Sequence, residues 1–162
     1  MPQYFGQLPT TDQPWVTVGA VVAVSQSDRA VQLNCGESSV LISVIDSNLI
    51  RVRLAPNGEF FPQRPWAVVA EDPERSPVPF KVEETAATVE IKTERMRVVV
   101  QRQPCRLTCF DNDDRPFAQD ADMGMSWRMG ATAAWKQIEA DENFYGFGER
   151  TGFLNKLSEV KT

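Results

Sequence analysis

The sequence predicts an all-β protein, an antiparallel β-sandwich with little helix. Apolar and polar residues alternate with a period of two along much of the chain, the pattern of strands that have one buried and one solvated face. Turn-forming residues separate these runs at intervals of about ten residues, as in antiparallel sandwiches. No long segment shows a convincing helical period.

The first half of the chain is expected to contain four strands. They are predicted at residues 15–24, 30–34, 39–45 and 50–54, separated by turns at 27–28, 46–48 and 56–58. In the last of them, Ile50, Val52 and Leu54 alternate with arginines and are expected to face inward. Residues 60–79 contain five prolines and form a long connection, within which residues 66–69 make a short strand or packed turn.

The second half of the chain also shows alternating apolar and polar residues separated by turns. Strands are predicted at 89–91, 96–100 and 107–109, and residues 133–142 are interpreted as a further strand. Arg95, Arg97 and Arg102 flank one apolar run and are expected on its solvated face. Residues 111–115 are interpreted as a hairpin turn, because Arg115 and Pro116 occupy positions where a calcium loop needs an oxygen ligand and a glycine.

Length and composition fit one globular domain. Of the 162 residues, 42% are hydrophobic and 24% are charged. We expect a sandwich over residues 1–141, with 142–162 as the terminal segment of the same domain. The net charge of −5 argues against nucleic acid and anionic membranes as partners. The first residues lack a signal-peptide pattern and no apolar run is long enough to cross a bilayer, so we expect a cytoplasmic protein.

The residue types present restrict the chemistry. The chain has no histidine, which argues against histidine-dependent hydrolases, most zinc sites and histidine-using epimerases, and we expect neither a metal nor a cofactor. Cys105 and Cys109 are four apart in a strand, about 13 Å, too far for a disulfide. The three cysteines are therefore expected to be reduced and buried. Asp120 and Asp122 are interpreted as exposed loop carboxylates rather than an acid–base pair.

Four tryptophans leave two interpretations open. They suit the core or boundary of a sandwich, and they also suit a platform on which sugar rings stack. They are Trp15, Trp66, Trp127 and Trp135.

The most distinctive segment covers residues 142–152. Its two glycines, Gly146 and Gly148, do not match a dinucleotide fingerprint, because Thr151 stands where the third glycine belongs. Adjacent residues of an extended chain point to opposite faces, so Glu149 and Arg150 are expected to make separate contacts. Such an aromatic, glycine-rich element should dock against a partner, which the ten residues after it do not supply. We therefore expect a domain of a larger protein.

Residues 144–152 closely resemble the aromatic-Tyr-Gly-Leu-Gly-Glu-Arg element of family 31 glycoside hydrolases, which include α-glucosidases and α-xylosidases. Residues 50–53, 65–68 and 90–100 resemble further elements of the same family in the same order, so the resemblance covers about residues 40 to 155. Two positions depart from the family pattern. Asp114 stands in a turn that usually has glycine, and Phe147 replaces leucine.

The resemblance implies an amino-terminal β-sandwich of the galactose-mutarotase type that precedes a (β/α)8 barrel. In the family that barrel carries an aspartate nucleophile and an aspartate acid/base, so this chain is expected to contribute no catalytic residue. Its expected partners are the missing barrel and, through the parent enzyme, an α-glucoside. The residues implied at the interface with the barrel are Tyr145, Gly146, Phe147, Gly148, Glu149 and Arg150. Without the barrel, an apolar face should be exposed and a homodimer is expected.

Two other functions would need different residues. A free-standing carbohydrate-binding module would use an aromatic patch to bind an α-glucan. A mutarotase-type epimerase would use a histidine acid, which this chain lacks.

Overall fold

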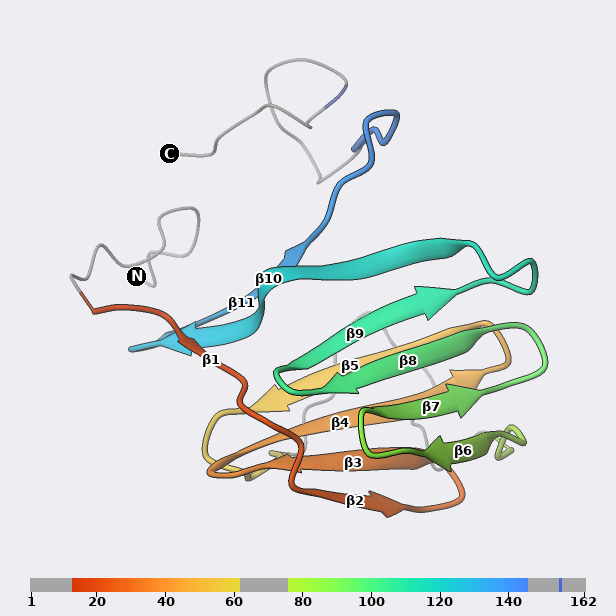
Figure 1. Ribbon diagram of the computed structural model, residues 1–162, viewed down its shortest axis with the longest axis horizontal. Coiled ribbons are helices and arrows are strands. Elements are labelled where there is room, and N and C mark those ends of the chain that lie inside the picture. Colours follow the sequence, from red (N-terminus) through yellow and green to blue (C-terminus); the bar gives the residue numbers. More distant parts are fainter. Residues whose placement is uncertain (1–12, 62–75, 146–154, 156–162) are drawn as a thin grey trace, which may run out of the picture.

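The computed structural model describes residues 13–61, 76–145 and 155. All regular structure within these residues is β-strand. The strands form a seven-stranded and a four-stranded sheet, and the two sheets lie one over the other (Figure 1). Every pairing between neighbouring strands is antiparallel. The prediction of an all-β antiparallel sandwich is confirmed.

The four-stranded sheet contains three of the predicted strands. Its order is β2 (Ala23–Gln26), β3 (Ala30–Cys35), β4 (Ser38–Asp46) and β5 (Leu49–Ala55). A two-residue connection joins β3 to β4, and Gly36 in it has a φ of 77°, a left-handed conformation that glycine adopts without a steric penalty. The strands expected at 30–34, 39–45 and 50–54 are therefore confirmed.

The seven-stranded sheet runs in the order β1, β10, β9, β8, β7, β6, and β11 pairs with β10. Strands β7, β8 and β9 correspond to predicted runs, whereas β6 and the longest strand, β10, were not predicted. The predicted strand at 133–142 is wrong in its second half, because the strand ends at Lys136. The bounds are β1 (Val16–Thr17), β6 (Lys81–Glu84), β7 (Thr88–Lys92), β8 (Arg97–Arg102), β9 (Cys105–Phe110), β10 (Pro116–Arg128) and β11 (Ala131–Lys136).

The single strand predicted for residues 15–24 is also wrong, because this stretch changes sheets. β1 belongs to the seven-stranded sheet and β2 to the four-stranded sheet, and residues 18–22 cross between them. Val18 and Val21 are both buried although they are three residues apart, which a continuous strand with a period of two does not allow. The crossing is held by backbone hydrogen bonds to both sheets, from Val21 N to Arg102 O (2.8 Å) and from Val22 N to Asn34 O (2.8 Å).

The core is the set of inward-facing aliphatic side chains between the two sheets. Alternate residues of β3 and β4 face alternate residues of β7, β8 and β9, as the period of two predicted. The fully enclosed members include Val31, Leu33, Val40, Ile42, Val89, Ile91, Val98 and Val100. Burial of this apolar surface is the main stabilising contribution to a sandwich of this size.

The outer face of the seven-stranded sheet carries the predicted charges. Arg97 lies over the Phe110 ring at 4.1 Å and forms an ion pair with Asp114 at 2.8 Å, which raises the pKa of Arg97. Asp114 lies in the predicted hairpin turn and has a φ of 58°. Aspartate tolerates this left-handed conformation better than most residues with a side chain.

The expectation that Asp120 lies in an exposed loop is wrong. Asp120 lies in β10 and is only 4% exposed. Its carboxylate accepts one hydrogen bond from Leu107 N at 2.8 Å and another from Lys136 Nζ at 2.5 Å. Asp122 is exposed, as expected, but belongs to the same strand and pairs with Arg106 at 3.2 Å. The register of β10 against β11 shifts between Asp120 and Met125, and an irregular strand of this kind has no simple period in the sequence.

We expect the substitution Asp120→Ala to lower the free energy of unfolding by about 1–3 kcal/mol, because it leaves the buried Leu107 N–H without its acceptor. Asp120→Asn keeps an oxygen at this position and should cost less. Asp122→Ala is the matched control, at an exposed position of the same strand, and should change stability by less than about 0.5 kcal/mol. Urea unfolding followed by circular dichroism measures all three. Equal losses for the two alanine variants would contradict the structural role of Asp120.

Candidate functional site

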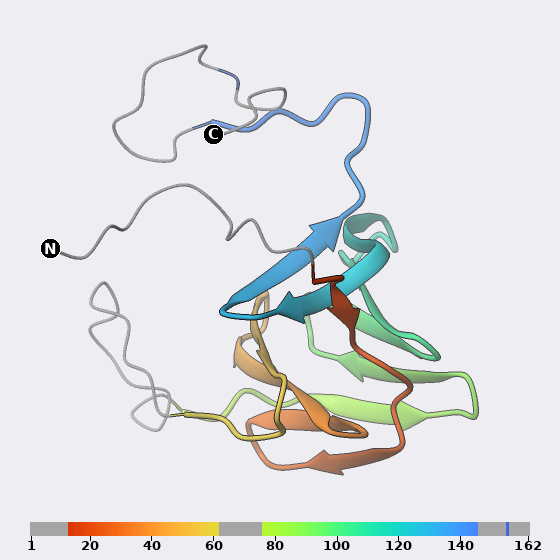
Figure 2. The ribbon, with the colours of Figure 1, turned by 90° about the vertical axis from the view of Figure 1, so that its left-hand side faces the viewer.

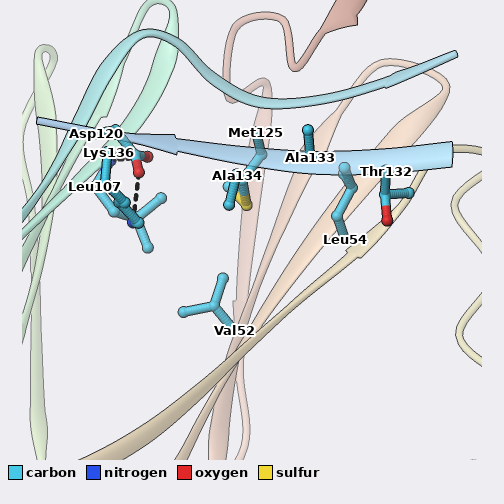
Figure 3. Close-up of a pocket in the computed structure, with 9 residues that line it drawn as sticks. All are labelled: Val52, Leu54, Leu107, Asp120, Met125, Thr132, Ala133, Ala134 and Lys136. Atoms are coloured by element: carbon cyan, nitrogen blue, oxygen red, sulfur yellow. Dashed lines mark hydrogen bonds and ion pairs between the residues drawn. The ribbon is translucent and has the colours of Figure 1, made fainter. Parts of the chain in front are cut away.

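A cavity of about 390 Å³ lies between β5 of one sheet and β11 of the other (Figure 3). β5 ends the four-stranded sheet, and β11 pairs with β10 alone among the described strands. These two strands lie on the same side of the molecule (Figure 2), but no backbone pairing joins them. The sandwich is therefore open along this side.

Most of the cavity wall is apolar. Val52 and Leu54 line it from β5, as predicted for the inward face of this strand, and Val52 is 37% exposed because the cavity opens to solvent. Leu107 and Met125 line it from the seven-stranded sheet. An apolar group that entered the cavity would contact aliphatic side chains from both sheets.

The polar end of the cavity is formed by Asp120 and Lys136, whose ion pair is marked in Figure 3. Both carboxylate oxygens of Asp120 already accept hydrogen bonds. These two donors hold the carboxylate in a fixed position, so this arrangement suits binding rather than catalysis. The sequence pattern did not reveal this pair, because the pairing of β10 with β11 was not predicted.

A tryptophan cluster, Trp15 and Trp135, lies where β1 and β11 both pair with β10. The rings of Trp15 and Trp135 are perpendicular, with centroids 5.9 Å apart, and the Arg128 guanidinium lies 4.6 Å from the Trp15 ring centre. The Trp135 Nε1–H donates a hydrogen bond to the buried Ser126 Oγ at 2.8 Å. Both tryptophans are boundary residues that retain exposed surface, which agrees with one of the two interpretations of the sequence.

The predicted interface element lies at the end of the described chain. Tyr145 is 59% exposed, whereas Gly146, Phe147, Gly148, Glu149 and Arg150 lie outside the described residues. After β11 the chain runs away from the two sheets (Figures 1 and 2). Asn155 accepts a hydrogen bond from Phe144 N at 3.1 Å and donates one to Asn143 Oδ1 at 2.7 Å. The residues that flank the element are thus close together in space.

The described residues show neither a metal cluster nor a membrane helix. No group of three or more acidic, cysteine or histidine side chains is gathered within them. The same part of the chain contains no helix that is long and apolar enough to span a bilayer. All three cysteines are free and buried, as expected, and burial raises the pKa of the Cys109 thiol.

Comparison with known proteins identifies relatives that are much longer than this chain. It is 30% identical over 148 residues to alpha-glucosidase 2 of Bacillus thermoamyloliquefaciens, covering 91% of this chain and 18% of that protein. A GH31 dextranase of Flavobacterium johnsoniae, solved in complex with glucose, has a TM-score of 0.79 and 27% identity, over 87% of this chain and 18% of the dextranase.

A third relative shares the fold at lower identity. The GH31 alpha-xylosidase of Xanthomonas citri has a TM-score of 0.66 and 23% identity, over 82% of this chain and 16% of the xylosidase. The chain thus spans less than a fifth of the length of each of these proteins. Residues 39–160 match the family described as the glycosyl hydrolase 31 N-terminal galactose mutarotase-like domain. The chain belongs to this family, as the resemblance of its glycine element implied.

Proposed function

We propose that this chain is the non-catalytic amino-terminal domain of a retaining, α-glucosidase-type glycoside hydrolase. The observation that carries the proposal is the family match over residues 39–160, which includes the whole predicted interface element. The relative named alpha-glucosidase 2 supports the reaction, and the chain's 18% share of that protein supports a role as one domain among several.

The parent enzyme is proposed to cleave α-linked glucosides in the cytoplasm. Its two catalytic carboxylates would lie on a (β/α)8 barrel about 5 Å apart, the separation that allows one of them to act as nucleophile and the other as acid and base. The sandwich would support the barrel and help shape its outer substrate subsites. The GH31 dextranase of Flavobacterium johnsoniae, which is similar to this chain, has been solved in complex with isomaltotriose, which supports a sugar substrate for the parent enzyme.

The surface proposed to meet the barrel starts at the end of β11. Trp135 and Ile138 are exposed there, and Tyr145 follows them on the segment that leaves the sandwich. Exposed large apolar side chains lose unfavourable contact with water when a partner covers them. This contact would join the barrel directly to the strand that lines the cavity.

An activity assay tests the proposal, because catalysis is assigned to the barrel and not to this chain. The 162-residue chain should release no nitrophenol from p-nitrophenyl α-glucoside, whereas a chain extended by the coding sequence that follows residue 162 should hydrolyse it. Proton NMR of the extended enzyme should show the α-anomer of glucose as the first product, because two displacements retain configuration. Hydrolysis by the rigorously purified 162-residue chain, or inversion by the extended enzyme, would contradict the proposal.

Association of the 162-residue chain is a second expected outcome. With no barrel to cover the end of β11, we expect a homodimer in sedimentation velocity at high protein concentration. Ile138→Asp should shift the chain to monomer, because Ile138 is 54% exposed at this surface. Val22→Asp is the matched control, since Val22 is 69% exposed but lies beside β2. A monomer at every concentration, or equal effects of the two substitutions, would exclude this dimer.

A carbohydrate-binding module is the second candidate, and the Trp15–Trp135 pair favours it. Aromatic rings at a protein surface can stack on the apolar faces of sugars. If the chain binds sugar by itself, calorimetry with maltotriose or isomaltotriose should give saturable heat that Trp135→Ala abolishes. Trp127→Phe, at a position packed against the core, is the control. The absence of heat with both oligosaccharides would remove this candidate.

A further inference from the structure

The cavity between β5 and β11 has the size and the wall of a small-ligand site. Its volume of about 390 Å³ lies within the range of pockets that bind small molecules. Leu107 and Met125, on its inner side, are buried members of the core. Val52 of β5 and Ala134 of β11, which also line it, are exposed. The cavity is therefore enclosed by the core on one side and open to solvent on the other.

The charged groups of the described wall are confined to one end of the cavity. Asp120 and Lys136 lie together there, whereas Met125 and Leu54 lie farther along the cavity (Figure 3). The Asp120 carboxylate is fixed by hydrogen bonds from Leu107 N and Lys136 Nζ. An ammonium group has three N–H donors, and the bond to Asp120 uses one of them. Because the Lys136 side chain is 46% exposed, its ammonium group is accessible to a ligand that enters from solvent.

The charges at this end select against an ionic ligand. Asp120 and Lys136 neutralise each other, so the pair has no net charge to compensate an ion. A carboxylate attracted to Lys136 would lie close to the fixed carboxylate of Asp120, and a cationic ligand would meet the ammonium group of Lys136. Either ion would lose hydration without gaining a full partner charge, which is costly. The electrostatics of the site therefore favour a neutral ligand.

The rest of the wall selects against a ligand with many hydroxyl groups. None of the described residues that line the cavity is aromatic, so they offer no ring on which a sugar could stack. Sugar hydroxyls placed against Val52, Leu54 and Met125 would find no hydrogen-bond partner, and burial of unpaired polar groups is unfavourable. Thr132 supplies one hydroxyl group at an exposed position of β11, too few for a sugar. An aliphatic chain gains free energy at the same place because it leaves water.

We propose that this cavity binds a small neutral amphiphile, a short aliphatic chain with a single hydroxyl group, of which the simple aliphatic alcohols are examples. The chain lies against Val52, Leu54 and Met125, and the hydroxyl oxygen accepts a hydrogen bond from Lys136 Nζ. The site is separate from the tryptophan pair and does not depend on a catalytic barrel. It can therefore be tested on this chain, whatever the activity of the parent enzyme.

Methyl NMR of the 162-residue chain with isotope-labelled methionine methyl groups tests the site, with 1-hexanol as the probe. Met125 lines the cavity, whereas Met129 is 63% exposed outside its wall and Met96 is buried in the core. We expect 1-hexanol to shift the Met125 signal saturably and to leave the signals of Met129 and Met96 unchanged. Equal shifts of Met129 and Met125, or a response without saturation, would indicate nonspecific contact and overturn the proposal.

A series of ligands tests the chemical class. Because an alkyl group in the cavity leaves water, each methylene added from 1-butanol to 1-hexanol should lower the dissociation constant by about two- to fourfold. Hexanoate and hexylammonium have six carbon atoms, as 1-hexanol does, and should bind at least about tenfold more weakly because they bring an uncompensated charge. An affinity for either ion that equals or exceeds that for 1-hexanol would overturn the assignment, and so would an affinity that does not depend on chain length.

A matched pair of variants locates the site. Ala134→Phe places a ring in the cavity from an exposed position of β11 and should abolish the shift of Met125 by 1-hexanol. Val22→Phe adds a ring beside β2, where the side chain is 69% exposed, and should leave the dissociation constant unchanged. Circular dichroism checks that both variants fold. Saturable binding by Ala134→Phe, or an equal loss of binding in both variants, would overturn the proposal. If Ala134→Phe does not fold, the methionine signals and the ligand series decide on the unsubstituted chain.

Discussion

The structure depends on the packing of two apolar sheet faces against each other. Each strand of the core presents alternate side chains to the interface, so Leu33 and Ile42 from one sheet and Ile91 and Val100 from the other lie in the same buried layer. A shift of one residue in any pairing would move these side chains to the solvated face. Burial of the layer therefore sets the register of every strand that contributes to it.

The same constraint explains where the sandwich is incomplete. The core is continuous through β3, β4, β7, β8 and β9, but β5 and β11 do not pair where the sheets end. Side chains from both strands leave a cavity there, and the buried Asp120 is bound to Lys136 at one end of it. A charged pair tolerates the edge of the core because Lys136 reaches solvent, which reduces the cost of desolvation.

The surface features with functional interest all lie at this incomplete side. The tryptophan cluster joins β1 to the β10–β11 hairpin, and the chain leaves the sandwich after β11 toward Tyr145. Away from this side, the crossing segment around Gly19 holds the two sheets together beside Cys35 and Cys105. The two sheets are thus joined by hydrogen bonds at the crossing segment and unpaired between β5 and β11. This arrangement suits a rigid domain that binds a partner on one side.

The strands with strict alternation could be predicted from the sequence, and so could the turns between them. Residues 30–34, 50–54 and 89–91 needed no tertiary information, because a period of two is a local property of a half-buried strand. β6 is short, and β10 has a shifted register, so neither left a clear period to detect. The switch of sheets at residues 18–22 was missed for a related reason, since it interrupts a run of residues with high β propensity.

The sequence by itself determined the fold class, the inward faces of the regular strands and, through the residues around Gly146 and Gly148, the family. Tertiary structure alone decided which distant residues meet. It buried Asp120 against Leu107 and Lys136, and it brought the crossing segment at residues 18–22 into hydrogen bonds with both sheets. Periodicity reports which face of a strand is covered, but it carries no information about which strand of the other sheet covers it.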